Sequence, residues 1–123
     1  MKSLIFVLAL FFVTIGCVVW IDLSFEARMN EIILQCEKIE SASDISEAKQ
    51  AFDDVSEKWH SMRKVLFAVL NHTDIDTVDY AVEMLEFAID SGDIDKIRLG
   101  ACSLGYYLDD MLDTEMLSLS NIL

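Results

Sequence analysis

The sequence predicts an all-α protein in which an N-terminal transmembrane helix precedes a four-helix bundle made of two repeated helical hairpins. Three observations support this prediction. Residues 4–21 form an uncharged apolar run that, as a helix, would rise about 27 Å, close to the apolar thickness of a bilayer. Apolar side chains in residues 22–123, the body, recur at the spacing of helix faces. The chain has no proline and only four glycines, so little interrupts its helices.

The apolar run predicts an uncleaved membrane anchor. Lys2 precedes the run, whereas Asp22 and Glu26 follow it. Because the cytoplasmic flanks of membrane helices collect Lys and Arg, we expect the N-terminus inside the cytoplasmic membrane and the body outside. Residues 1–21 are then the anchor, which can continue directly into the first body helix. Residues 22–123 form one extracytoplasmic helical bundle with an apolar C-terminal tail.

Two other fates of the apolar run stay open. Thr14-Ile15-Gly16 resembles the small-residue site at which a secretory signal is cleaved, which would make the protein secreted. The same residues followed by Cys17 resemble a lipoprotein site, with Cys17 as the lipidated residue. The run continues past both sites through the apolar residues 18–21, and this favours the uncleaved anchor.

The body is strongly acidic. It contains all 22 acidic side chains and eight of the nine basic ones, a net charge of −14. This charge would be repelled by nucleic acid phosphates and by anionic lipid headgroups. We therefore expect no nucleic acid partner, and contact with the bilayer through the N-terminal helix.

Four stripes of apolar side chains predict four helices in the body. In chain order they are Phe25, Met29, Ile32, Cys36 and Ile39; Ala48, Phe52, Val55, Trp59, Met62, Leu66 and Val69; Ile75, Val78, Val82, Leu85 and Ile89; and Ile94, Ile97, Ala101, Leu104, Leu108 and Met111. We expect these helices to end near Ser41, near Asn71-His72-Thr73, at Ser91-Gly92, and before a tail of residues 113–123. At the end of the second helix, His72 would interact favourably with the helix dipole.

The body repeats itself. Residues 33–45 and 82–94 align without gaps at an offset of 49 residues, and the helices that follow them align as well. Asp44 is predicted to cap the second helix, and its equivalent in this alignment, Asp93, is the predicted start of the fourth helix. A single hairpin could not bury its own stripes, so the two should pack together as a bundle.

Two glycines lie inside the predicted fourth helix, where glycine is destabilising and usually has a packing reason. We expect Gly100 and Gly105 to face large rings, with Phe52 and Trp59 as candidates. A binding crevice beside the glycines is the alternative.

The sequence contains no pattern typical of catalysis. His60 and His72 have no second ligand at metal-binding spacing, and no nucleophile–base motif, Cys-x-x-Cys pair or phosphate-binding loop is present. Cys36 and Cys102 are expected to be two buried free thiols that could pair only if their helices touch. We therefore expect neither an enzyme nor a cofactor site.

Acidic side chains form one face of the predicted third helix. They are spaced alternately by three and four residues: Asp76, Asp79, Glu83, Glu86 and Asp90. The ordinary interpretation is a solvated face, because exposed charge is screened by salt. The alternative is a cation site or a module that senses conditions in the cell envelope.

Two apolar segments are expected to meet at the end of the bundle nearest the membrane. The candidate partner-binding residues are Val65, Phe67, Ala68 and Leu70 at the end of the second helix, and Leu117, Leu119 and Ile122 in the tail. One helix face against the bundle cannot account for all of them, which suggests contact with lipid or with a membrane partner. Alternatively, the tail covers Phe67 and Leu70.

The whole chain resembles a known family. The resemblance rests on the Lys-Ser start before the apolar run, on Trp59, on the junction at residues 71–76, and on the terminal residues 117–123. With these features the chain resembles the bacterial family labelled only as domain of unknown function 4363, which is found in Gram-positive, mostly clostridial relatives. The resemblance implies a single-pass membrane protein without an assigned activity, associated with a multi-pass membrane protein. We therefore expect a non-catalytic accessory to an integral membrane protein at the outer face of the cytoplasmic membrane.

Overall fold

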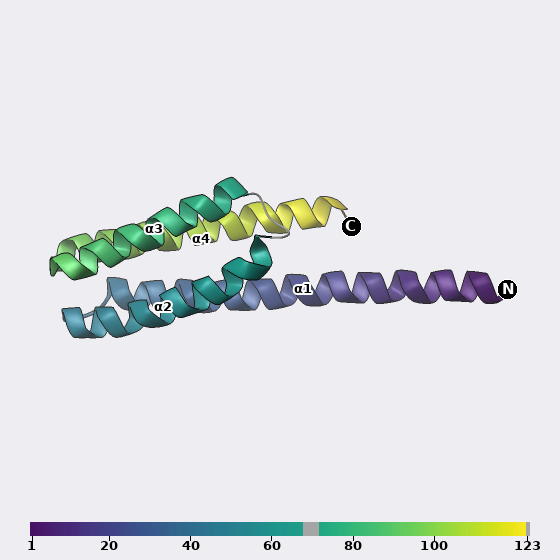
Figure 1. Cartoon of the computed structure of the whole chain (residues 1–123), viewed down its shortest axis with the longest axis horizontal. Helices are drawn as coiled ribbons and strands as arrows, with labels where there is room; N and C mark the ends of the chain where they lie inside the picture. The colour runs from purple at the N-terminus through teal and green to yellow at the C-terminus, as the bar shows by residue number, and fades with distance from the viewer. Residues whose placement is uncertain (68–71, 123) are drawn as a thin grey trace.

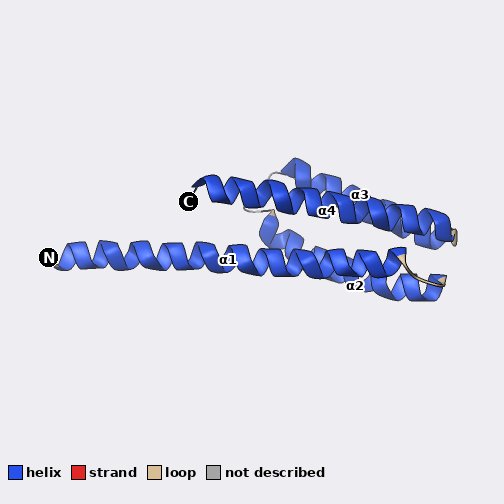
Figure 2. Ribbon diagram, turned by 180° about the vertical axis from the view of Figure 1, so that it is seen from behind, coloured by secondary structure: helices blue, strands red, loops and turns tan. Residues whose placement is uncertain are grey.

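The protein is all-α in the computed structural model, which describes residues 1–67 and 72–122, without the side chains of 21–22 and 115–122. Four helices follow in chain order: α1 (Lys2–Glu40), α2 (Ile45–Leu66), α3 (His72–Ser91) and α4 (Ile94–Ile122) (Figure 1). Figure 2 shows only helices and their connections in the described part of the chain. The predicted fold class, all-α, is confirmed.

The apolar run and the first body helix form one helix of 39 residues, α1. The N-terminal half of α1 projects well beyond the other helices (Figure 1), and none of its most apolar stretch is buried. Among the described residues, α1 is the one helix long and apolar enough to cross a membrane.

The four helices pack as two antiparallel hairpins, α1–α2 and α3–α4 (Figures 1 and 2). Each helix contacts two neighbours, in the ring order α1, α2, α3, α4; the contact between α1 and α4 is the most extensive and that between α2 and α3 the least. Both hairpin turns lie far from the N-terminus (Figure 1). The end of α2, the start of α3 and the end of α4 therefore lie together near the projecting half of α1. We call this the proximal end.

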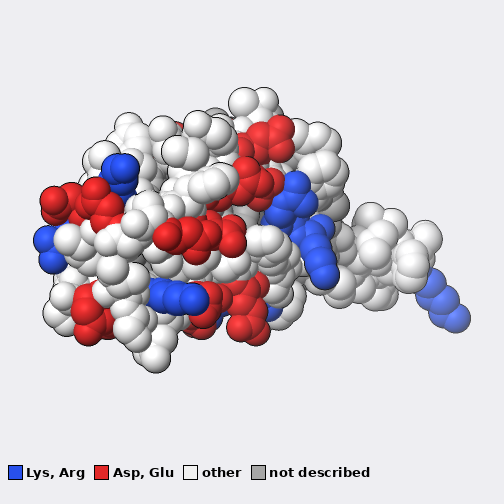
Figure 3. Space-filling view, turned by 60° about the vertical axis from the view of Figure 1, so that its left-hand side comes forward, with Lys and Arg blue, Asp and Glu red and all other residues white. Residues whose placement is uncertain are grey.

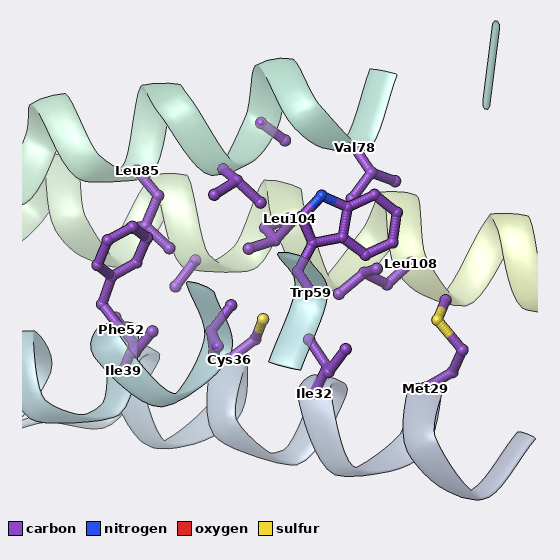
Figure 4. Close-up of a cluster of buried hydrophobic side chains, with 14 of the residues drawn as sticks. Met29, Ile32, Cys36, Ile39, Phe52, Trp59, Val78, Leu85, Leu104 and Leu108 are labelled. Carbon is purple, nitrogen blue, oxygen red and sulfur yellow. The ribbon is translucent and has the colours of Figure 1, made fainter. Parts of the chain in front are cut away.

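The predicted stripes form the core. Figure 4 shows Ile32 of α1, Trp59 of α2 and Leu104 of α4 directed toward one another. The largest fully buried side chains come from all four helices: Met29, Ile32, Ile39, Val55, Trp59, Ile75, Val78, Leu85, Ile97, Leu104 and Leu108. Burial of these apolar surfaces is the main contribution to stability.

Equivalent positions of the two hairpins have equivalent roles. Asp44 accepts a hydrogen bond from the backbone N–H of Glu47 at 2.8 Å, and Asp93 accepts one from the backbone N–H of Asp95 at 3.0 Å. These bonds satisfy amides that the first turn of a helix leaves without intrahelical partners. Gly92 follows the last residue of α3 with φ of +73°, a left-handed conformation that favours glycine at the end of a helix, so the predicted helix end at Ser91-Gly92 is confirmed.

Two predicted helix ends are wrong. His72 is the first residue of α3 and does not belong to the last turn of α2. α2 ends at Leu66, and Val69 falls outside the described residues. The expected tail of residues 113–123 is instead a continuation of α4 as far as Ile122, because no Pro or Gly after Gly105 interrupts the helix.

The partners expected for the glycines of α4 are also wrong. A Cβ on Gly100 would lie 3.2 Å from Cδ1 of Leu85 in α3, and one on Gly105 would lie 3.8 Å from Cβ of Cys36 in α1. The expected rings of Phe52 and Trp59 belong to α2, which lies diagonally opposite α4 in the ring of helices. Gly100 thus allows a close approach of α3 and α4.

The two body cysteines differ in exposure. Both are free, Cys36 is buried and Cys102 is exposed, so the expectation of two buried thiols is wrong for Cys102. Burial, with smaller contributions from the charges of Glu37 and Glu40, raises the pKa of the Cys36 thiol from its usual 9.0 to about 12.

This difference predicts selective thiol chemistry. In the full chain with Cys17→Ser, an aromatic disulfide reagent should modify Cys102 rapidly and leave Cys36 unmodified until the protein unfolds. Because an unfolded Cys36 would ionise near pH 9 and the folded one near pH 12, this group should lower the stability as pH rises through that interval. Rapid modification of a Cys17→Ser, Cys102→Ser chain in the native state would contradict the buried position of Cys36.

Candidate interaction surfaces

The proximal end of the bundle presents apolar side chains from the end of α2. Val65 is 60% exposed and Phe67 is 44% exposed. The Phe67 ring stacks on the His72 ring with centroids 4.2 Å apart, and the Arg63 guanidinium carbon lies 5.5 Å from the Phe67 centroid. Phe67 is therefore held in place by polar neighbours while much of its surface remains accessible.

The other predicted partner-binding residues lie outside what the structure describes. Ala68 and Leu70 fall in the segment between α2 and α3, and of Leu117, Leu119 and Ile122 only the helical backbone is described. That backbone ends at the proximal end (Figure 1). The expectation that Ala68, Leu70 and the end of α4 form one apolar surface with Val65 and Phe67 therefore stays a prediction.

Asp79 connects α2 and α3 through two polar contacts. It accepts a hydrogen bond from the indole N–H of the buried Trp59 at 2.8 Å, and its second oxygen lies 2.7 Å from Nε of Arg63. α2 and α3 have the least extensive contact of the four neighbouring pairs of helices. The two polar contacts of Asp79 therefore stabilise the interface that has the least packing. Sequence reasoning missed this role, although a Trp in a core stripe usually requires a partner for its N–H.

The other four residues of the predicted acidic face, Asp76, Glu83, Glu86 and Asp90, are exposed. Within the described residues, no group of three or more potential ligand side chains is arranged to hold a metal ion. Figure 3 shows acidic side chains in several groups over the bundle, while the projecting part of α1 carries none and ends in a basic tip.

Cation binding by this acidic face stays a prediction. If it occurs, millimolar calcium should raise the melting temperature of the full chain more than sodium at matched ionic strength. Glu83→Gln with Glu86→Gln should remove the difference, whereas an equal response to both salts would mean charge screening alone.

A second apolar surface was not predicted from the sequence. It is a groove of about 540 Å³, and among the described residues only those of α3 and α4 line it. Tyr80, Met84 and Phe87 contribute from α3, and Leu99 and Tyr107 from α4. The signal was present in α3, since Tyr80, Met84 and Phe87 repeat at helical spacing on the face opposite the core.

The fold and these surfaces define an all-α, bundle-like protein with a long apolar N-terminal helix and exposed apolar surfaces. The chain belongs to the family described as "Domain of unknown function (DUF4363)", whose model matches residues 21–122. The family resemblance in the sequence is thereby confirmed. Neither a curated protein nor a solved structure matches the chain significantly.

Proposed function

We propose that the protein is a membrane-anchored helical interaction module and a non-catalytic accessory to an integral membrane protein. Residues 1–21 act as a single-pass anchor, and residues 22–123 form a bundle of two repeated hairpins at the outer face of the cytoplasmic membrane. The observation that carries this proposal is the projecting half of α1, whose most apolar stretch is buried against no part of the protein. A helix that is apolar on every face is stable when lipid surrounds it.

The orientation rests on charge. Lys2 lies directly before the apolar run, whereas the first basic residue after the run is Arg28, so the basic residue nearest the apolar run is on the N-terminal side, which is favoured when the N-terminus stays inside. The exposed Lys49 of α2 offers a position for a topology test.

We expect Lys49→Cys, in a chain with Cys17→Ser and Cys102→Ser, to react with a membrane-impermeant thiol reagent on intact cells. Ser3→Cys in the same background is the matched control on the other side of the membrane and should react only after lysis. The opposite pattern would reverse the orientation. A diacylglycerol found on Cys17 of the natural chain by mass spectrometry would replace the anchor with a lipoprotein.

We propose that the integral membrane protein contacts the proximal end. Val65 and Phe67 are exposed there, close to where α1 would enter the bilayer (Figure 1). Exposed apolar side chains grouped beside a membrane are typical of contact surfaces.

Phe67→Ser tests this contact. Because Phe67 is 44% exposed, the change should alter the melting temperature of the full chain little, while recovery of an integral membrane partner after mild detergent extraction should fall. Leu34→Ser on α1, 55% exposed, is the matched control and should leave recovery unchanged. A loss of several kcal/mol of stability in Phe67→Ser would instead mark Phe67 as core and contradict the contact.

A further inference from the structure

The groove between α3 and α4 contains several large apolar side chains that the bundle leaves exposed. Phe87 is 72% exposed, Leu99 69% and Tyr80 64%. Phe87 and Leu99 are the most exposed large apolar residues in the described part of the body. They lie on opposite sides of one groove, so their exposure is concentrated in one place.

The base of the groove is built from small residues. Ala81 and Ala88 of α3 and Gly100 and Ser103 of α4 line it between the larger side chains. The close approach of Gly100 to Leu85 brings the two helices together beneath them. The result is a shallow, elongated apolar surface with ridges at Tyr80 and Phe87. This shape suits the apolar face of a helix, whose side chains project at intervals of three and four residues.

The rims of the groove are acidic. Asp76, Glu83 and Asp90 recur every seven residues along α3, on the face next to Tyr80 and Phe87. Asp95 and Asp110 follow the outer side of α4. All five carboxylates are exposed, and α3 carries no Lys or Arg.

One basic side chain, that of Lys96, lies among the described residues lining the groove. The second basic residue of α4, Arg98, is directed elsewhere, since its guanidinium donates a hydrogen bond to the Ala42 carbonyl at 3.4 Å. An apolar surface between acidic rims is complementary to one kind of ligand, apolar along its centre and positively charged along its edges.

We propose that the α3–α4 groove binds an amphipathic helix of a partner protein, with apolar side chains on the face that enters the groove and Lys or Arg on its flanks. A second copy of this chain is disfavoured, because two acidic rims would face each other. An anionic membrane surface is repelled for the same reason. This surface is separate from the contact at the proximal end and does not depend on it.

The test uses the full chain in nanodiscs of neutral phosphatidylcholine. The probes are designed helices of about 20 residues, with Leu, Phe or Met along one face and Lys on both flanks, carrying a fluorescent label. Fluorescence anisotropy measures their binding, and empty nanodiscs provide the background. The control probes have the same apolar face with Glu in place of Lys.

We expect at least one Lys-flanked helix to bind at least about tenfold more tightly than its Glu-flanked counterpart. The double variant Phe87→Ser, Leu99→Ser should weaken that binding by about tenfold or more, with an unchanged melting temperature because both residues are exposed. Leu34→Ser and Phe67→Ser should bind the probe as the natural chain does. Added salt should weaken the binding.

Three results would overturn the proposal. They are equal binding of Lys-flanked and Glu-flanked helices, equal binding of the probe by the natural chain and the double variant, and no binding of any probe helix by the natural chain. Self-association that the double variant abolishes, with no competition from the Lys-flanked helix, would assign the groove to a second copy. Groove-dependent binding of anionic vesicles by the chain would assign it to lipid. Phe67→Ser changes the proximal end and leaves the groove intact. A failure of the groove proposal can therefore be distinguished from a failure of the proposed contact at the proximal end.

Discussion

Trp59→Ala should lower the free energy of unfolding by about 3–5 kcal/mol. Trp59 is 1% exposed, and Figure 4 places its indole among Val78, Leu104 and Leu108, which belong to α3 and α4. Removing the ring leaves a cavity where three helices meet, and the neighbouring side chains can fill it only in part. Since small domains are stable by about 5–15 kcal/mol, this single change should remove a large share of the stability of the bundle.

Urea unfolding of the full chain in a neutral detergent, followed by circular dichroism, measures this loss. Trp20→Ala provides a matched control, because Trp20 is 69% exposed on the projecting half of α1. It should leave the unfolding of the bundle unchanged. A loss below about 1 kcal/mol for Trp59→Ala would mean that the indole is not packed as the structure places it.

Asp79→Ala should lower the free energy of unfolding by about 1–3 kcal/mol. The change leaves the buried indole N–H of Trp59 without its acceptor. It also removes the ion pair with Arg63, which contributes less because both charged side chains are partly exposed. Glu83→Ala removes an exposed carboxylate from the same helix and should cost less than about 0.5 kcal/mol.

Two further variants separate the hydrogen bond from the charge. Asp79→Asn keeps an oxygen acceptor for the indole and should cost less than Asp79→Ala. In a Trp59→Phe background, which lacks the N–H, the cost of Asp79→Ala should shrink by the energy of that hydrogen bond. If Asp79→Ala costs the same in both backgrounds, the bond between Trp59 and Asp79 contributes nothing.

The buried stripes were predictable because core-facing residues must repeat with the period of the helix. Ile32, Trp59 and Leu85 are buried as their spacing indicated. The capping positions Asp44 and Asp93 were predictable for a local reason, since a cap requires only a side-chain oxygen one turn before the amide it accepts from.

Features that depend on which helices are neighbours were not predictable in the same way. The partners of Gly100 follow from the ring order of the helices, which the periodicity of the stripes does not indicate. The exposure of Cys102, in contrast, was predictable, because Cys102 lies outside the stripe that contains Ala101 and Leu104. The role of Asp79 was hidden because it shares the spacing of four exposed acids. Only the packing of α3 against α2 distinguishes it from them.

The outer apolar row of α3 was overlooked for a different reason. Tyr80, Met84 and Phe87 repeat with the helical period, as core residues do, but they stand opposite the stripe that contains Val78 and Leu85. A helix with two apolar faces buries one in its own bundle and leaves the other available. The periodicity alone does not indicate what covers the second face.

The unbroken course of α1 has a mechanical consequence. A flexible linker between anchor and bundle would let the two swivel independently. Here a single helix runs from Lys2 to Glu40, and its last 19 residues, from 22 to 40, extend about 28 Å through the bundle. In the proposed membrane-anchored arrangement, any tilt of the N-terminal half of α1, or any turn of it about its own axis, is therefore transmitted as torque to all four helices. The height of the bundle above the bilayer and the direction in which each of its faces points are properties of the anchor as much as of the bundle itself.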